Sequence, residues 1–489
     1  MPRRATSTAT ELTGLHLTDD DGEDEQDFDG SSPDNHTQYK EREQKLLRKL
    51  GISFFLFGLI NNVLYVIILS AALDLVPPST PTGIVAFCNI APSMVAVSWS
   101  YILRGKIRYG RRLAVCCFLS MSGMLVVAIF DSLFMRLLGI AMTSFSTGLG
   151  ELTFLQLSTT YSPPSIGGHS VGYFASGTGA AGLVGAFLWW EVRGLGVRLG
   201  VGMSSLMPSI IPLTYYFLLP TPSAFLYPMN PTDYNDLLSP PPPISALPYT
   251  PLPEAEDEEG EEEGTTTSGP KRGVALSVAD KWRLVKPLIP KYMLPLFLVY
   301  LLEYTINQGI GPTLLYPVPP KEGHWFLSKI IHSVRDYYPL WQLVYQTTVF
   351  LSRSSISLGI PALPKRLLPL PAIIQFGILS ALAYESAVGF FSPQSESLNV
   401  FFVFLMVCVE GICGGLAYVN VFYHINHEPP DPNTSHDIEQ TRQEREFKIG
   451  SIGFSISNGI LLASILAVPT EIELCKAQIG RGKMLCKGL

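Results

Sequence analysis

Residues 52–72 read ISFFLFGLINNVLYVIILSAA, an apolar run that contains no charged side chain. The hydrocarbon core of a bilayer is about 30 Å thick, and a helix of about 20 apolar residues crosses it. Lipid offers no partner to free backbone N–H and C=O groups, so such a run is predicted to be a helix. Ten further runs of this kind follow, near 82–103, 112–132, 134–161, 168–190, 201–219, 291–312, 337–360, 368–391, 397–423 and 448–469. The sequence therefore predicts an all-α polytopic membrane protein with about 11 transmembrane helices.

The composition excludes several other classes of protein. Of the 489 residues, 47% are hydrophobic and only 15% are charged, well below the share in soluble domains. The net charge of −7 comes from two acidic tracts, 19–29 and 254–263, and outside them basic residues predominate. Those basic residues flank the apolar spans, which fits loops that face anionic lipid and does not fit nucleic-acid binding.

Residues 220–286 divide the spans into six before and five after. This segment is rich in proline and acidic residues and is predicted to be a disordered linker. Two helical bundles joined by a long central loop are typical of major facilitator transporters, so a major-facilitator-like fold is expected. The stretch 313–336 is broken by prolines and charges and is compatible with a loop or an interfacial helix. The predicted parts are a disordered acidic tail 1–50, a six-helix bundle 51–219, the linker 220–286, a second bundle 287–470 and a C-terminal tail 471–489.

The distribution of Lys and Arg predicts the orientation. Basic residues cluster before the first span and after the second, which places the N-terminus and the central linker in the cytosol. Arg193 and Arg198 fall on the other, lumenal side and conflict with this rule. Eleven spans also leave a basic C-terminal tail in the lumen, so either one crossing is missed or the tail is an exception. The basic residues of that tail are Lys476, Arg481, Lys483 and Lys487.

Three acidic residues lie well inside predicted spans: Glu151, Glu303 and Glu410. An ionisable group at mid-bilayer costs roughly 2.5–3.5 kcal/mol on insertion scales, so its presence indicates a function. Carboxyl groups in that position suit proton uptake and release across the membrane of an acidic organelle. The alternative is a protonated carboxyl group that makes a structural hydrogen bond between helices.

One cation and several amides accompany these acids. Arg353 lies deep in the second half and needs a partner, either an intramembrane carboxylate or an anionic substrate group. The amides are Asn61, Asn62, Asn307, Gln308 and Asn420. Glu303 and Asn307 are four residues apart and share a helix face, which indicates a polar cavity. The alternative for the amides is hydrogen bonding between helices.

The remaining motifs argue against catalysis and cofactor binding. The seven cysteines include no CxxC pair, and buried thiols are expected in place of a disulfide framework or a zinc site. Gly168–Gly172 matches GxSxG, but the strand that this motif requires is not expected in a membrane span. Asp233, Leu237 and Leu238 match an acidic dileucine signal for sorting adaptors. Cys486 begins an imperfect prenylation box. No enzyme, cofactor or metal site is predicted.

Several unusual blocks together resemble the battenin family, the Batten-disease membrane proteins and their fungal vacuolar relatives. They include FFLFGLINNVLYVIILSAALD, GLGELTFLQL, YLLEYTINQG, YQTTVFLSRSSIS and VEGICGGLAYVNVFYHI, in order across residues 51–469. The resemblance implies a multi-pass protein of the lysosomal or vacuolar membrane with a major-facilitator-like fold. It also implies roles in organelle pH homeostasis and in transport of basic amino acids or related small metabolites.

These arguments lead to one expected function and one alternative. We expect an alternating-access transporter of the vacuolar membrane, coupled to protons, whose small-molecule substrate binds in a cavity between two bundles. The alternative is a non-transporting adaptor in the membrane that regulates the proton pump or vacuolar trafficking. The lipid bilayer is a partner in either case, and nucleic acid in neither.

Overall fold

The computed structural model describes residues 33–77, 80–99, 109–158, 160–161, 164–225, 278–319, 325–356, 358, 360–391, 396–426, 428 and 438–488. The chain divides into two units, Met1–Gln44 and Lys45–Leu489. Of the first unit, only the start of one helix is described. All the regular structure in the described residues is helical, as predicted.

The helices of the first part of the chain form what we call the first group. They are α1 (Pro33–Ser70), α2 (Ala72–Leu75), α3 (Gly83–Trp99), α4 (Tyr109–Ile129), α5 (Leu133–Ser158), α6 (Pro164–Val192), α7 (Gly196–Ser204) and α8 (Ile210–Leu213). Glycines let these helices approach closely. A Cβ at Gly177 of α6 would overlap the carbonyl oxygen of Phe55 on α1, so only glycine fits there.

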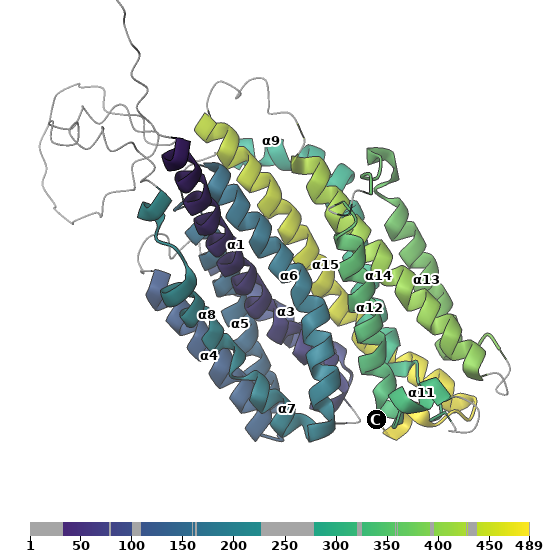
Figure 1. The fold of residues 1–489 in the computed structure, drawn as a ribbon. Coiled ribbons are helices and arrows are strands. Elements are labelled where there is room, and N and C mark those ends of the chain that lie inside the picture. The colour runs from purple at the N-terminus through teal and green to yellow at the C-terminus, as the bar shows by residue number, and fades with distance from the viewer. Residues whose placement is uncertain are drawn as a thin grey trace, which may run out of the picture. The chain divides into compact units, whose positions relative to one another are not determined.

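The helices after residue 277 form the second group. They are α9 (Val278–Leu288), α10 (Leu294–Thr305), α11 (Trp325–Ile330), α12 (Tyr337–Arg353), α13 (Leu370–Ala387), α14 (Glu396–Asn426) and α15 (Ile438–Gly480). Within it, α10 packs against α13, α14 and α15, and α12 packs against α14. The two groups meet where α6 contacts α12 and where α3 contacts α15 (Figure 1).

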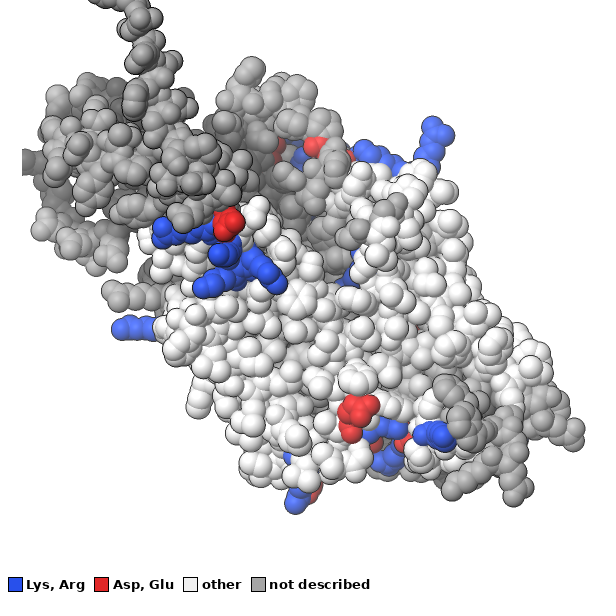
Figure 2. Space-filling model, in the orientation of Figure 1, with Lys and Arg blue, Asp and Glu red and all other residues white. Residues whose placement is uncertain are grey.

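The surface of Lys45–Leu489 is that of a membrane protein. Large apolar side chains are exposed on many helices, among them Phe118, Phe134, Phe217 and Phe401. Figure 2 shows a broad belt without charged residues on the face in view, with Lys, Arg, Asp and Glu gathered at its two ends. A contiguous apolar belt of this kind is expected where lipid surrounds the helices.

Among the described residues, eight helical stretches are long and apolar enough to cross a membrane, and Gly83–Val97 is a shorter apolar helix. One stretch, Ile166–Leu218, contains two of the predicted spans, 168–190 and 201–219. The predicted span 337–360 is not among these stretches, because α12 covers only Tyr337–Arg353 of it, and the number of crossings, about 11, stays a prediction.

Several predicted boundaries differ from the observed ones. α1 begins at Pro33, so the helix includes part of the predicted tail 1–50. α12 ends at Arg353 and does not continue to residue 360. There the Ser354 hydroxyl donates to the Phe350 carbonyl oxygen, and the Ser355 N–H donates to the Ser352 carbonyl oxygen in a tighter turn that ends the helix.

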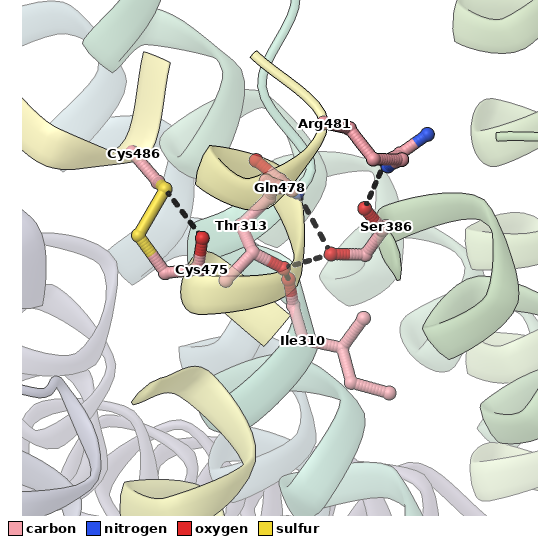
Figure 3. Close-up of a disulfide and its surroundings, with 7 residues drawn as sticks. All are labelled: Ile310, Thr313, Ser386, Cys475, Gln478, Arg481 and Cys486. Atoms are coloured by element: carbon pink, nitrogen blue, oxygen red, sulfur yellow. Dashed lines mark hydrogen bonds between the residues drawn. A yellow bond between two sulfur atoms is a disulfide. The ribbon is translucent and has the colours of Figure 1, made fainter. Parts of the chain in front are cut away.

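The expectation that the cysteines form no disulfide is wrong for one pair. Cys475 and Cys486 are joined by a disulfide near the C-terminus (Figure 3). The expectation of free thiols holds for the other five, Cys88, Cys116, Cys117, Cys408 and Cys413. Most of the predicted linker, with Asp233, Leu237 and Leu238, lies outside the described residues.

Candidate functional site

The polar centre of the second group begins at an irregularity in its first long helix. After Thr305 the α-helix α10 widens into a π-helical turn, η9 (Ile306–Ile310), followed by a 3₁₀ turn, η10 (Gly311–Thr313). π-Turns inside helices are rare and are frequent at functional sites. Asn307 and Gln308 both lie in this turn and are buried. The irregular turn therefore carries two of the predicted site residues.

Two of the three predicted acids lie together. Glu303 of α10 and Glu410 of α14 are each only 1% exposed. The Asn307 amide connects them: its Nδ2 donates to the Glu303 carbonyl oxygen (3.0 Å) and to Glu410 Oε1 (3.0 Å). Gln342 Nε2 of α12 in turn donates to Asn307 Oδ1 (3.1 Å). Two buried glutamates are thus linked by the Asn307 amide, through the backbone of Glu303 and the carboxyl group of Glu410, and Gln342 holds that amide in place.

Gln375 of α13 also joins this pair, although the sequence reasoning did not single it out. Its Nε2 lies 3.4 Å from Glu303 Oε2 and 3.3 Å from the Glu410 carbonyl oxygen. Its Oε1 is buried without a hydrogen-bond partner. An unpaired buried acceptor beside a carboxyl group is satisfied when that carboxyl gains a proton and becomes a donor. A glutamine in the middle of the apolar run PAIIQFGIL was the available signal.

A glycine makes room for Glu303. A Cβ built on Gly414 of α14 would lie 2.8 Å from Glu303 Cδ and would overlap one carboxyl oxygen. A Cβ built on Gly411 would likewise overlap the Thr348 side chain of α12, and one on Gly415 would overlap Ser352. The glycines of α14 thus bring its backbone against the side chains of α10 and α12, which fixes the position of Glu303.

Arg353 has no carboxylate within ion-pair distance among the described residues. Its Nη2 donates to the Tyr300 hydroxyl (3.0 Å), and its guanidinium lies over the Tyr418 ring, 4.3 Å from the centroid. Its Nε is buried without a partner. A built Cβ on Gly179 of α6 would lie 4.0 Å from Arg353 Cδ, so the arginine lies beside the first group. The nearby Glu303 carboxyl group acts on the charge of Arg353, so both partners predicted for this arginine, an intramembrane carboxylate and an anionic substrate group, stay predictions.

Glu151, the third acid, does not join the other two. It lies on α5 in the first group and its side chain is exposed. It nevertheless interacts electrostatically with Tyr418, which also carries the Arg353 guanidinium on its ring. Glu151 and Arg353 lie on different groups of helices, and neither forms an ion pair with the other.

Three of the predicted amides make hydrogen bonds between separate segments of the chain. Asn61 Nδ2 donates to the Thr147 carbonyl oxygen (3.0 Å) and so joins α1 to α5. Asn62 Nδ2 donates to the Thr178 hydroxyl on α6 (3.3 Å). Asn420 Oδ1 accepts from the Leu363 backbone N–H (2.7 Å). The contacts of these three residues are therefore of the kind that the alternative for the amides, hydrogen bonding between helices or segments, describes.

Gln308 belongs to a set of contacts between the two groups of helices. Its backbone oxygen accepts from the Thr82 hydroxyl (2.7 Å) at the start of α3, and the same hydroxyl lies 2.9 Å from Glu471 Oε2 of α15. The Tyr338 hydroxyl donates to the Leu69 carbonyl oxygen (3.0 Å) and also lies 3.3 Å from Gln308 Oε1. These contacts involve the C-terminal end of α1 and the N-terminal ends of α3 and α12.

Two ion pairs join the groups at the same end. Arg193 Nη1 lies 3.0 Å from Asp336 Oδ1, and Arg335 Nη1 lies 4.0 Å from Asp74 Oδ1. Burial raises the pKa of Asp74, and the nearby Arg335 opposes that shift. Arg193 is thus paired across the groups. Arg198, the other arginine that conflicted with the charge rule, is paired with Asp131 within the first group (2.5 Å).

The described residues contain no set of three His, Cys, Asp or Glu side chains that could hold a metal ion. The site consists of carboxyl groups, amides, tyrosines and one guanidinium. These groups can hold a proton or bind a small charged or polar molecule through hydrogen bonds.

Fold and site together define a polytopic helical membrane protein with a buried polar centre. The family described as CLN3 protein matches residues 52–477. Protein BTN1 of Mycosarcoma maydis is 42% identical over 94% of this chain and 90% of its own length. Protein btn1 of Schizosaccharomyces pombe is 36% identical over 90% of this chain and 97% of its own length. The chain therefore belongs to the CLN3 (battenin) family, as its sequence blocks indicated.

The solved structures that resemble this one are membrane transporters of low sequence identity. The nucleoside transporter NupG is 11% identical, with a TM-score of 0.48, over 90% of this chain and 97% of its own. A bacterial homologue of the human lysosomal transporter Spinster is 12% identical, with a TM-score of 0.46, over 91% and 98%. No conclusion about substrate follows from likeness at this level.

Proposed function

We propose that this protein is a transporter that moves a small charged metabolite across the vacuolar membrane in exchange for, or together with, protons. The single observation that carries the proposal is the buried Glu303–Glu410 pair, held by Asn307 and Gln375. A carboxyl group that is buried out of water is costly to ionise, so each of these two buried groups can hold a proton. A transported proton needs such a binding position.

The charges of Arg353 and Glu151 support a substrate that carries both an anionic and a cationic group. Arg353 has one unpartnered N–H, which suits a carboxylate or another anionic group. Glu151 is exposed and suits a cationic group. Basic amino acids or related small metabolites carry both kinds of charge. In this proposal the substrate lies between Arg353 and Glu151 and the proton lies at Glu303 and Glu410.

The architecture supports alternating access as the mechanism. The first and second groups of helices contact one another through α6 with α12 and α3 with α15. We assign the bundles to residues 51–219 and 287–470 and propose that they rock about the site in the manner of major facilitator transporters. The N-terminus and the linker 220–286 are assigned to the cytosol, where Asp233, Leu237 and Leu238 would bind sorting adaptors.

Vacuolar location and a role in vacuolar pH follow from the same proposal. A transporter that carries protons out of an acidic compartment changes its pH directly. An adaptor that acts on the proton pump would change the pH without moving a substrate of its own. Flux through the purified protein separates these two possibilities.

The test is flux in reconstituted vesicles with a pH difference across the membrane, using labelled lysine or arginine. We expect Glu303→Gln to abolish stimulation by the pH difference, because glutamine cannot bind and release a proton. Glu385→Gln is the matched control: Glu385 is also buried in the second group, but it binds Tyr316 and the Phe390 N–H outside the site. Stimulation that survives in Glu303→Gln would overturn the coupling role, and absence of any flux in the wild type would favour the adaptor.

A further inference from the structure

A disulfide and several hydrogen bonds hold the C-terminal segment against the second group of helices. The disulfide between Cys475 of α15 and Cys486 closes a loop over the end of the helix (Figure 3). The remaining thiols lie on α3, α4 and α14 and are buried or half-buried. The only cysteines that are paired in the described residues are thus the two outside the centre of the helical bundle.

Hydrogen bonds hold the same segment against α13 and the end of α10. Gln478, which is completely buried, donates through Nε2 to the Thr313 carbonyl oxygen (2.8 Å) and to the Ser386 hydroxyl (2.9 Å). Arg481 Nη2 donates to the Ser386 carbonyl oxygen (2.9 Å). The Lys483 ammonium lies over the Tyr316 ring, 4.6 Å from its centroid. The segment is therefore a cap on this end of the second group.

This cap lies at one end of a helix that crosses the membrane. The candidate span on α15 is Phe447–Gly480, and Cys475 lies near its last residue. At about 1.5 Å per residue, these 34 residues are longer than the hydrocarbon core is thick. The start of α15 and the capped end therefore face opposite sides of the membrane.

We propose that the capped end faces an oxidising compartment, the lumen of the secretory pathway and then of the organelle, and that the Cys475–Cys486 disulfide forms there. Disulfides persist in such compartments and are rare where glutathione keeps thiols reduced. In the reaction the two thiols lose two protons and two electrons and form one S–S bond. A protein disulfide of a thiol oxidoreductase in the lumen accepts them and becomes two thiols.

The contacts of the basic tail residues agree with this placement. Lys476 pairs with Glu473 (2.7 Å), Arg481 binds backbone carbonyl oxygens and Lys483 lies on a tyrosine ring. Charges satisfied within the protein do not need anionic cytosolic lipid. The tail is then the exception to the charge rule. Cys486, once in a disulfide, is not available for prenylation.

A consequence concerns the conformation of the protein. The contacts of Thr82 with Glu471 join the two groups of helices, and Glu471 precedes Cys475 by one helical turn. The groups are therefore joined at the capped end. If that end is lumenal, the structure shows a conformation that is closed toward the lumen.

The inference about the cap does not depend on transport, and it would stand if the protein carried no substrate.

The first experiment counts thiols in the full-length protein with a maleimide polymer that shifts gel mobility. Membranes are prepared in acid, which prevents thiol exchange without blocking thiols, and the denatured protein is labelled with and without prior reduction. We expect five accessible thiols before reduction and all seven after it. Cys486→Ser should give six in both samples, and Cys413→Ser, the control, should rise from four to six. Seven thiols in the unreduced wild type would overturn the disulfide.

The second experiment determines the side of the membrane independently. A flexible extension with one Asn-Gly-Thr acceptor is added after Leu489, and the same extension is added before Met1 as the control. We expect a glycan, removable by endoglycosidase, on the C-terminal extension alone. A glycan on the N-terminal extension alone would overturn the proposed sidedness, whatever the flux measurements show. Glycans on neither would do so if a lumenal control protein carrying the extension is modified.

Discussion

Removing the hydroxyl of Thr82 is expected to loosen the contact between the two groups of helices at the capped end. Thr82 is completely buried at the start of α3. Its Oγ1 donates to the Gln308 carbonyl oxygen (2.7 Å) and lies within hydrogen-bond distance of Glu471 Oε2 (2.9 Å). Both partners belong to the second group, so opening at this end breaks both contacts. Thr82→Val keeps the shape of the side chain and removes the donor.

The expected magnitude follows from the one hydrogen that the hydroxyl can donate. A hydrogen bond inside a protein contributes about 1 kcal/mol net, so its loss weakens the closed conformation by about 1 kcal/mol. Because each 1.4 kcal/mol is a factor of ten, the ratio of open to closed protein should rise by about fivefold. The backbone N–H of residue 82 still donates to Glu471 (2.8 Å), which keeps the effect from being larger.

The assay is a distance measurement by pulsed electron resonance between two spin labels in nanodiscs. One label is placed at Leu199 of α7 and the other at Ile472 of α15, both on exposed positions of different groups. The native free thiols are replaced beforehand. We expect a longer-distance population in Thr82→Val that is minor or absent in the parent protein.

The control is Thr470→Val, one residue before Glu471. Its hydroxyl is exposed and donates to the Leu466 carbonyl oxygen of its own helix (2.8 Å). The same substitution there breaks no contact between groups and should leave the distances unchanged. Equal distance distributions in Thr82→Val and Thr470→Val would refute the assignment of Thr82 as a closing contact.

Three further predictions concern the charged residues and their surroundings. Gly414→Ala should lower both flux and the apparent melting temperature, because its Cβ displaces the Glu303 carboxyl at a cost of about 1–3 kcal/mol; unchanged melting would contradict this. Arg353→Lys should reduce flux at least tenfold while expression is preserved, because an ammonium group cannot reproduce the guanidinium contacts; wild-type uptake kinetics would show that charge alone suffices. Burial raises the pKa of Asp74, against the opposing charge of Arg335, so the closed form binds a proton more readily than an opened, solvated form. Closure at that end should therefore be favoured as pH falls through the acid range and weaken as pH rises; spin-label distances that change with pH in Asp74→Asn as they do in the parent protein would contradict this.

The sequence predicted those features that depend on local chemistry. A run such as 52–72 must be helical in lipid whatever surrounds it, because the backbone has no other partners. The intramembrane acids could be found for the same reason, since the cost of placing Glu303 or Glu410 in lipid does not depend on the detailed fold. The family could also be recognised from blocks that are contiguous in the chain.

Partners far apart in the chain could not be predicted in this way. Asn307 and Glu410 are 103 residues apart, and Gln375 and Glu303 are 72 apart. Nothing in a single sequence states which polar side chain faces which. Glu151 resembled the other two acids in its sequence surroundings, yet it lies in another group of helices.

The disulfide shows the same limit at short range. Cys475 and Cys486 are separated by 11 residues, but an odd number of cysteines without a paired motif gave no reason to join them. Their approach depends on how the chain turns after Gly480 and on the contacts of Gln478 with Thr313 and Ser386.

Hydrophobicity and intramembrane charge are properties of residues, and the sequence by itself determined the helical membrane class and the identity of its costly polar groups. Proximity is a property of packing. Only the tertiary structure decided that Glu303 and Glu410 form a pair, that Arg353 rests on Tyr418, and that Thr82 joins the two groups of helices. The physical reason is that glycine-lined contacts between helices, such as Gly414 against Glu303, select one arrangement among many that the same spans allow.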